Sequence, residues 1–120
     1  MASDGTRVLV VDDNVEYAQN IAEILTIGGY ATEVFATAEE ALPVALAPFV
    51  RAVITDYRLP GMNGIELVRR ILSERAGVKM VVISAYADDS AVDTARMLGA
   101  KFLPKPVDVG DLERLVRAAS

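Results

Sequence analysis

Three short runs of apolar residues stand out along the chain. They are Val8–Val11, Ala52–Ile54 and Met80–Ile83. Runs of this length, rich in β-branched residues and without alternation, are typical of strands buried on both faces of a parallel sheet. Two further segments, Ala31–Phe35 and Lys101–Leu103, are more polar or shorter, and we expect them at the edges of the sheet.

Between these segments, apolar residues recur with the period of an amphipathic helix. Three helices are predicted from their apolar faces: the first from Ala18, Ile21, Ala22 and Leu25, the third from Leu67, Val68, Ile71 and Leu72, and the fifth from Leu112, Leu115, Val116 and Ala119. The second helix is predicted from a Thr37/Glu40 capping box. The fourth is predicted from a cap at Asp88, Asp89 or Ser90 and a stop at Gly99. Gly28 should end the first helix, and Gly77 the third. Pro43 should kink or shorten the second helix, and Asp108 should cap the fifth.

Strand and helix thus alternate five times with short connections. This order predicts an α/β fold, a flavodoxin-like open three-layer sandwich with five helices and a five-stranded parallel sheet in the order 2-1-3-4-5. That order places the three apolar strands inside and the two weaker strands at the edges. We expect one domain over residues 1–120, with its core at about 7–119.

Composition narrows the classes of protein that fit. Of the 120 residues, 52% are hydrophobic and 24% charged, as in a globular domain, and the net charge of -5 argues against direct nucleic-acid binding. No apolar run reaches the length of a membrane span, and no signal-peptide core is visible, so we expect a cytoplasmic protein without membrane contact. The lack of Cys and His excludes disulfides, thiol catalysis and Ser-His-Asp chemistry.

Polar residues follow four of the predicted strands. They are Asp12 and Asp13 after the first, Thr55 and Asp56 after the third, Ser84 after the fourth and Lys105 after the fifth. Each residue alone is consistent with an ordinary cap or turn. Ligands of open α/β sheets bind beyond the carboxyl ends of the strands, where the strand order reverses. We therefore expect these side chains to converge on one site.

Three neighbouring carboxylates repel one another unless a cation lies among them. An all-oxygen site suits a hard divalent cation such as Mg²⁺. With such a cation bound, one carboxylate can stay ionised and act as a nucleophile toward phosphorus, giving an aspartyl phosphate. The Lys105 ammonium and the Ser84 hydroxyl are suited to contact the phosphoryl oxygens.

The ordered set of motifs resembles the receiver domain of two-component response regulators, of the chemotaxis-regulator kind. The matching residues are Asp12-Asp13, Asp56 with Pro60 and Gly64, Ser84-Ala85 and Lys105-Pro106, and the resemblance extends from about Arg7 to Ala119. It implies a signalling domain that catalyses only its own phosphorylation and dephosphorylation, with a histidine kinase or phosphotransfer protein as donor.

The resemblance also implies roles for single residues. Asp56 would be the phosphoacceptor, and Asp12, Asp13, Asp56 and the backbone carbonyl of Arg58 would hold Mg²⁺, with Asp12 acting partly through water. Ser84 would bind the phosphoryl group and move with it, Lys105 would pair with the phosphate, and Phe102 would report the state of Ser84. The Lys105-Pro106 peptide would be cis. Side chains at Arg58 and Tyr86 would tune the phosphate lifetime, with a bulky Tyr86 slowing hydrolysis.

The output face would comprise the fourth helix, the fifth strand and the fifth helix, and a downstream protein would bind there. Whether the chain also forms a homodimer through this face is left open. So is whether it is a stand-alone regulator or part of a larger protein.

Two alternative functions remain, a phosphorylation-independent docking module and an aspartate-nucleophile phosphohydrolase. The phosphohydrolases place Asp-x-Asp after the first strand, whereas this chain has Asp12-Asp13-Asn14. A dinucleotide-binding site is excluded because the chain lacks the Gly-rich loop after its first strand. An EF-hand is excluded because Tyr17 stands where the calcium loop needs Gly.

Overall fold

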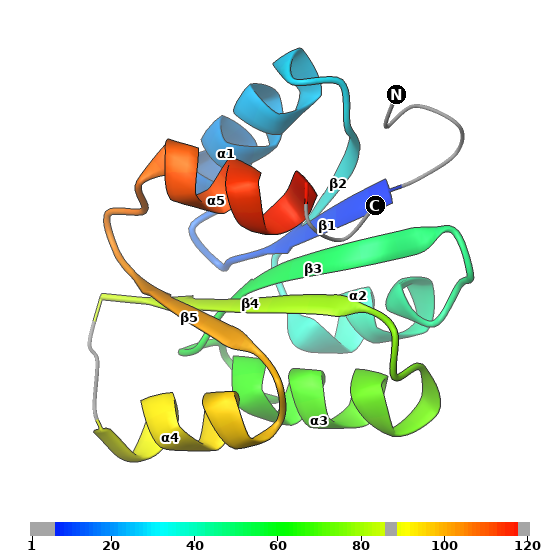
Figure 1. Ribbon diagram of the computed structural model, residues 1–120, viewed down its shortest axis with the longest axis vertical. Coiled ribbons are helices and arrows are strands. Elements are labelled where there is room, and N and C mark those ends of the chain that lie inside the picture. Colours follow the sequence, from blue (N-terminus) through cyan, green and yellow to red (C-terminus); the bar gives the residue numbers. More distant parts are fainter. Residues whose placement is uncertain (1–6, 86–88, 118–120) are drawn as a thin grey trace.

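The computed structural model describes residues 7–85 and 89–117 (Figure 1). Within them the strands are β1 (Arg7–Val11), β2 (Ala31–Phe35), β3 (Val50–Asp56), β4 (Lys79–Ser84) and β5 (Lys101–Pro104). The helices are α1 (Val15–Ile27), α2 (Ala38–Ala45), α3 (Gly64–Glu74), α4 (Asp89–Met97) and α5 (Val109–Arg117). The alternation of strand and helix predicted from the apolar pattern is therefore confirmed.

The strands form one parallel sheet in the order β2-β1-β3-β4-β5. This confirms the predicted flavodoxin-like order, with the three apolar strands inside and β2 and β5 at the edges. All of Val8–Val11 is buried, whereas no residue of β2 is fully buried. The difference follows from position, because a central strand is covered by helices on both faces and paired on both sides.

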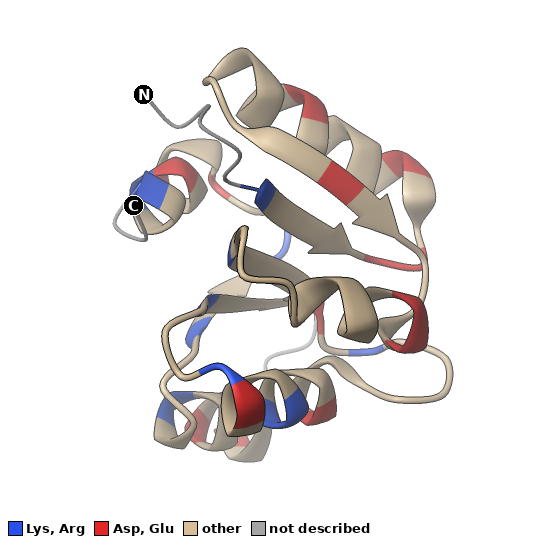
Figure 2. Cartoon of the chain, turned by 90° about the vertical axis from the view of Figure 1, so that its right-hand side faces the viewer, with Lys and Arg blue, Asp and Glu red and all other residues tan. Residues whose placement is uncertain are grey.

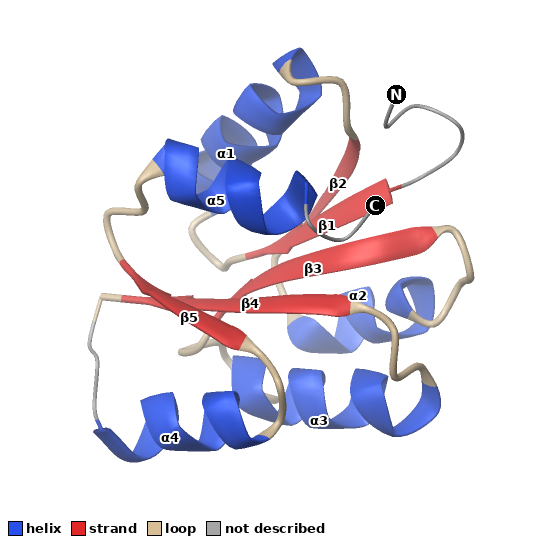
Figure 3. Cartoon of the chain, in the orientation of Figure 1, coloured by secondary structure: helices blue, strands red, loops and turns tan. Residues whose placement is uncertain are grey.

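Two layers of helices enclose the sheet. Helices α1 and α5 cover one face, and α2, α3 and α4 cover the other (Figures 1 and 3). Successive strand residues point to opposite faces, so Val8 and Val10 pack with the α1/α5 layer while Leu9 and Val11 pack with the other layer. None of the described helices has the length and apolar character that a membrane span requires.

Side chains cap the helices where the sequence predicts caps. The Thr37 hydroxyl accepts the Glu40 N–H at 3.2 Å and donates to the Glu40 carboxylate, so one half of the capping box forms. Asp108 caps α5 by accepting the Asp111 N–H at 3.1 Å. Pro43 lies inside α2, which has only eight residues, as expected from the missing N–H of proline.

Some boundaries differ from those predicted. Helix α3 ends at Glu74, before the expected stop at Gly77, because Arg75 already has an extended backbone. Strands β3 and β4 run through Asp56 and Ser84, which were expected just after them, since the parallel ladder continues to those residues. The predicted cap Asp88 and the last apolar position, Ala119, lie outside the described residues.

Candidate functional site

Three carboxylates gather at the carboxyl edge of the two central strands. Asp12 follows β1, Asp13 is next to it, and Asp56 is the last residue of β3. One carboxylate oxygen from each lies within 4.8 Å of the others. Asp12 and Asp56 are buried and Asp13 is exposed, so the cluster opens to solvent on the side of Asp13. The structure thus brings together the carboxylates that the sequence placed after different strands.

An ammonium group lies beside the cluster. Lys105 Nζ is 2.8 Å from Asp12 Oδ2 and 3.4 Å from Asp56 Oδ2, and only 19% of the lysine side chain is exposed. The Lys105 N–H donates to the Ser84 carbonyl at 2.9 Å, which fixes the backbone of the turn after β5. The peptide bond to Pro106 is cis, as the resemblance implied.

The charges of the site act on one another strongly. Burial raises the pKa of Asp56, the neighbouring Asp12 raises it further, and Lys105 only partly offsets these effects. For Lys105, burial acts to lower the pKa, but the bond to Asp12 and the attraction of both carboxylates outweigh it and the pKa is raised. Lys105 pairs with Asp12 and Asp56, and the close grouping of three carboxylates offers oxygen donors that suit a divalent cation.

Local backbone contacts hold these carboxylates in place. Asp12 Oδ1 accepts the Asn14 N–H at 2.9 Å, and the Thr55 hydroxyl donates to the Asp56 carbonyl at 2.9 Å. Helix α3 begins close against the same carbonyl, where a Cβ on Gly64 would lie 2.2 Å from the Asp56 oxygen. The sequence singled out Gly64 only through the resemblance, and this close approach is the physical reason for glycine.

The remaining predicted residues lie around this cluster. Ser84, the last residue of β4, is buried, and Phe102 in β5 is half-buried against the core on the α4 side. Arg58 is exposed in the loop after β3, and Tyr86 lies outside the described residues. The metal role of the Arg58 carbonyl, the switch roles of Ser84 and Phe102 and the effect of Tyr86 stay predictions.

Two contacts near the site were not foreseen from the sequence. The Tyr17 ring centroid is 4.8 Å from Lys105 Nζ. Glu39 in α2 accepts the Met62 N–H at 2.9 Å and so ties α2 to the loop that follows Asp56. No local pattern signals either contact, because each joins residues far apart in sequence.

The fold and the site together define a class. In open α/β sheets, ligands bind beyond the carboxyl ends of the strands where the strand order reverses, and this is where the three carboxylates and Lys105 lie. A sequence profile of the response regulator receiver domain matches residues 8–117. The chain therefore belongs to this family of two-component signalling domains, for which phosphorylation on aspartate and Mg²⁺ binding at an acidic pocket are characteristic.

Individual relatives agree with this assignment. The chain is 41% identical over 104 residues to a response regulator receiver protein of Anaeromyxobacter sp., covering 86% of this chain but only 44% of that protein. It is 39% identical over 108 residues to the chemotaxis protein CheY of Treponema pallidum, covering 85% and 74% of the two chains. A CheY-like receiver domain from Methanospirillum hungatei superposes with a TM-score of 0.88 at 31% identity, covering 94% and 91%.

Proposed function

We propose that this chain is a phosphoacceptor switch of a two-component phosphorelay, in which Asp56 takes a phosphoryl group from a phosphohistidine donor in a Mg²⁺-dependent reaction. The observation that carries the proposal is the cluster itself. Asp12, Asp13 and Asp56 offer oxygens within 4.8 Å of one another, and Lys105 Nζ lies 2.8 Å and 3.4 Å from two of them. A nucleophile, a set of oxygen ligands and a cation for the phosphate are thus present together.

The donor set fits Mg²⁺, which prefers a few carboxylate oxygens and keeps several waters. Asp12, Asp13 and Asp56 would hold it, together with the backbone carbonyl of Arg58. The exposure of Asp13 leaves room for waters and for a phosphoryl oxygen on the solvent side. When bound, Mg²⁺ supplies positive charge that neutralises the phosphoryl oxygens.

Asp56, Lys105 and Ser84 each have one role in the transfer step. A carboxylate oxygen of Asp56 attacks phosphorus while the P–N bond of the phosphohistidine breaks, and the imidazole leaves with the electron pair and takes a proton from solvent. Lys105 moves from its bond with Asp12 to a phosphoryl oxygen, to which its ammonium is attracted by opposite charge. The Ser84 hydroxyl donates to another phosphoryl oxygen.

The output follows from the new charge at the edge of the sheet. A phosphoryl group adds about -1.5 to -2 charges, and new bonds to Lys105 and Ser84 favour a second arrangement of these residues. Phe102 changes its rotamer as Ser84 moves. The surface of α4, β5 and α5 then binds a downstream protein differently.

Intact mass after incubation with acetyl phosphate, with and without Mg²⁺, tests the proposal. We expect one Mg²⁺-dependent phosphoryl adduct on the parent and none on Asp56→Asn. Asp93→Asn is the matched control, because Asp93 is exposed on α4 and stands apart from the cluster, so this variant should carry the adduct. Without Cys or His in the chain, an acyl phosphate is also recognised by its release with hydroxylamine.

An adduct that persists in Asp56→Asn would place the phosphoryl group on another residue. A folded parent that binds Mg²⁺ but gains no adduct from any small donor would instead favour a docking module that works without phosphorylation.

A further inference from the structure

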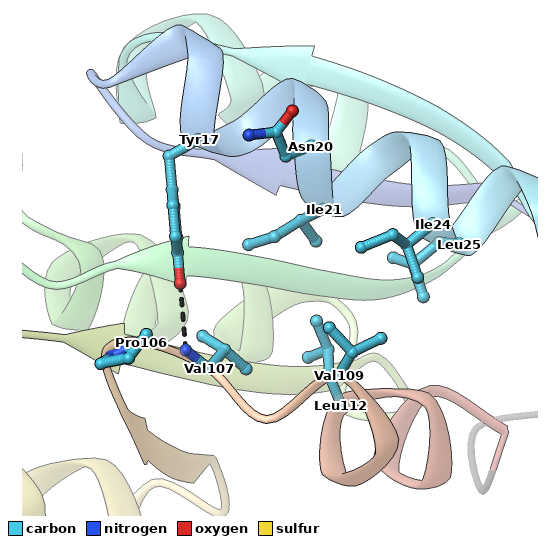
Figure 4. Close-up of a pocket in the computed structure, with 9 residues that line it drawn as sticks. All are labelled: Tyr17, Asn20, Ile21, Ile24, Leu25, Pro106, Val107, Val109 and Leu112. Carbon is cyan, nitrogen blue, oxygen red and sulfur yellow. Dashed lines mark hydrogen bonds between the residues drawn. The ribbon is translucent and has the colours of Figure 1, made fainter.

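Tyr17 in the first turns of α1 contacts both sides of the turn that carries Lys105. Its ring centroid is 4.8 Å from Lys105 Nζ, a cation–π distance. Its hydroxyl accepts the Val107 N–H at 3.1 Å, on the other side of Pro106 (Figure 4). One side chain therefore contacts the ammonium of residue 105 and the backbone of residue 107.

Tyr17 also completes a closed cycle of contacts around the site. Asp12 Oδ1 accepts the Asn14 N–H at 2.9 Å, and Asn14 Oδ1 accepts the Tyr17 N–H at 3.1 Å. The aromatic ring of Tyr17 contacts Lys105, whose ammonium donates to Asp12 Oδ2 at 2.8 Å and so closes the cycle of contacts. This cycle joins the start of α1 to the turn after β5.

Tyr17 is itself held firmly. It lies at one end of an apolar groove between α1 and α5 (Figure 4), which is lined further by Asn20, Ile21, Ile24, Leu25, Pro106, Val107, Val109 and Leu112. A tyrosine has only two rotatable side-chain bonds, so its ring is positioned at little entropic cost. A lysine has a long flexible stem and loses far more freedom when it is fixed.

We propose that Tyr17 is a positioning residue for Lys105, holding the ammonium between Asp12 and Asp56 where a phosphoryl oxygen will arrive. The inference rests on the proposed function of Asp56. The ring face attracts the ammonium, and the hydroxyl fixes the backbone that follows Pro106. Because a catalytic group displaced by about 1 Å can cost up to ~100-fold in rate, a residue that fixes Lys105 affects the rate of transfer.

The test compares Tyr17→Leu, which removes ring and hydroxyl, with Tyr17→Phe, which keeps the ring face. Tyr30→Phe is the matched control, since Tyr30 is a buried tyrosine just before β2, the edge strand on the side of the sheet away from β5. The rate of adduct formation with acetyl phosphate at saturating Mg²⁺ is one readout. The second is the NMR shift of the Lys105 Hε protons in the metal-free protein, which the ring current of Tyr17 moves upfield.

We expect Tyr17→Leu to slow adduct formation about three- to tenfold, Tyr17→Phe to stay within about twofold, and Tyr30→Phe to match the parent. The upfield shift should persist in Tyr17→Phe and vanish in Tyr17→Leu. A Tyr17→Leu protein that is phosphorylated at the parental rate would overturn the positioning role, as would an unchanged Lys105 shift. If the parent itself gains no phosphate, the proposed function fails, and the NMR comparison alone decides whether Tyr17 holds Lys105.

Discussion

Asp56 is a carboxylate in an unfavourable environment. It is buried, Asp12 and Asp13 lie beside it, and the Lys105 ammonium lies 3.4 Å from its Oδ2. Burial first, and then Asp12, raises its pKa. A raised pKa in the folded state means that ionised Asp56 destabilises the metal-free domain at neutral pH. The ion pair with Lys105, at 3.4 Å, offsets only part of this cost.

Replacing Asp56 with Asn should stabilise the metal-free domain. We expect the free energy of unfolding at pH 7 in EDTA to rise by about 1 kcal/mol, a typical size for a single substitution. The parent loses stability in full at a pH above the pKa of Asp56 in the folded state, and loses none at a pH below its pKa in the unfolded state. The difference in the free energy of unfolding between variant and parent should therefore narrow as the pH falls. Urea unfolding across a pH series measures this. A variant no more stable than the parent at pH 7 would contradict it.

Gly64 should not tolerate a methyl group. A Cβ there would lie 2.2 Å from the Asp56 carbonyl oxygen, so the start of α3 or the end of β3 must shift. We expect Gly64→Ala to lower the free energy of unfolding by about 1–3 kcal/mol. Gly77→Ala is the control, because nothing lies within 4 Å of its Cβ, and it should be neutral or slightly stabilising. Equal losses in both variants would argue against the close approach as the cause.

The convergence of site residues was predictable only in part. Asp12 and Lys105 each follow a strand and Asp56 ends one, and parallel strands end at one edge, so topology alone brings them together. Tyr17 and Glu39 were not predictable, because their partners Val107 and Met62 are 90 and 23 residues away and are set by packing. Short-range patterns carry no signal for such contacts.

At the scale of elements, the apolar pattern predicted the strands, the helices and the sheet order, because burial dictates both periodicity and topology. It placed some ends wrongly. Strand β3 continues to Asp56 through ladder bonds with β4, and α3 stops early at Glu74. These ends depend on hydrogen bonds with neighbouring elements, which the segment's own sequence does not encode.

The end of α3 offers a test at this scale. Arg75 Nη1 donates to the carbonyls of Ala45, Ala47 and Val50 at 3.0, 2.7 and 2.9 Å, so one guanidinium fastens the connection between α2 and β3. We expect Arg75→Met to lower the free energy of unfolding by about 2–3 kcal/mol, since charged hydrogen bonds and partly buried carbonyls are lost. Chemical denaturation measures the loss.

Arg70→Met is the matched control for this prediction. Arg70 is exposed and pairs only along its own helix with Glu66, at 3.1 Å, so its loss should cost no more than about 0.5 kcal/mol. If Arg70→Met destabilised the domain as much as Arg75→Met, the connection between α2 and β3 would not depend on the guanidinium.

At the scale of the whole molecule, charge is distributed unevenly. No Lys or Arg occurs between Arg7 and Arg51, and α1, β2 and α2 carry acidic segments only (Figure 2). The acidic residues of this stretch are Asp12, Asp13, Glu16, Glu23, Glu33, Glu39 and Glu40. Their field concentrates cations near the site and adds to the repulsion within the cluster.

Mg²⁺ should therefore stabilise the whole domain. A ligand at about 100 times its Kd adds roughly 2.7 kcal/mol to the free energy of unfolding, which raises the melting temperature by several degrees. We expect most of this shift to be lost in Asp13→Asn and kept in Glu16→Gln, an equally exposed acidic residue outside the cluster. Thermal unfolding of the parent and both variants, in Mg²⁺ and in EDTA, measures the shift in melting temperature. A shift that survives in Asp13→Asn would mean that Mg²⁺ acts through general screening.

The ion pair between Lys105 and Asp12 spans 93 residues of sequence. During synthesis the carboxylates of β1 and β3 emerge from the ribosome long before the lysine that balances them. A nascent chain that ends before residue 105 has its acidic cluster without its ammonium, so the cluster is balanced only after residue 105 has been made. Contacts of such long range also slow folding, because the closure of a long loop precedes them. The acidic cluster and its balancing ammonium thus come together only after the closure of a long segment of chain.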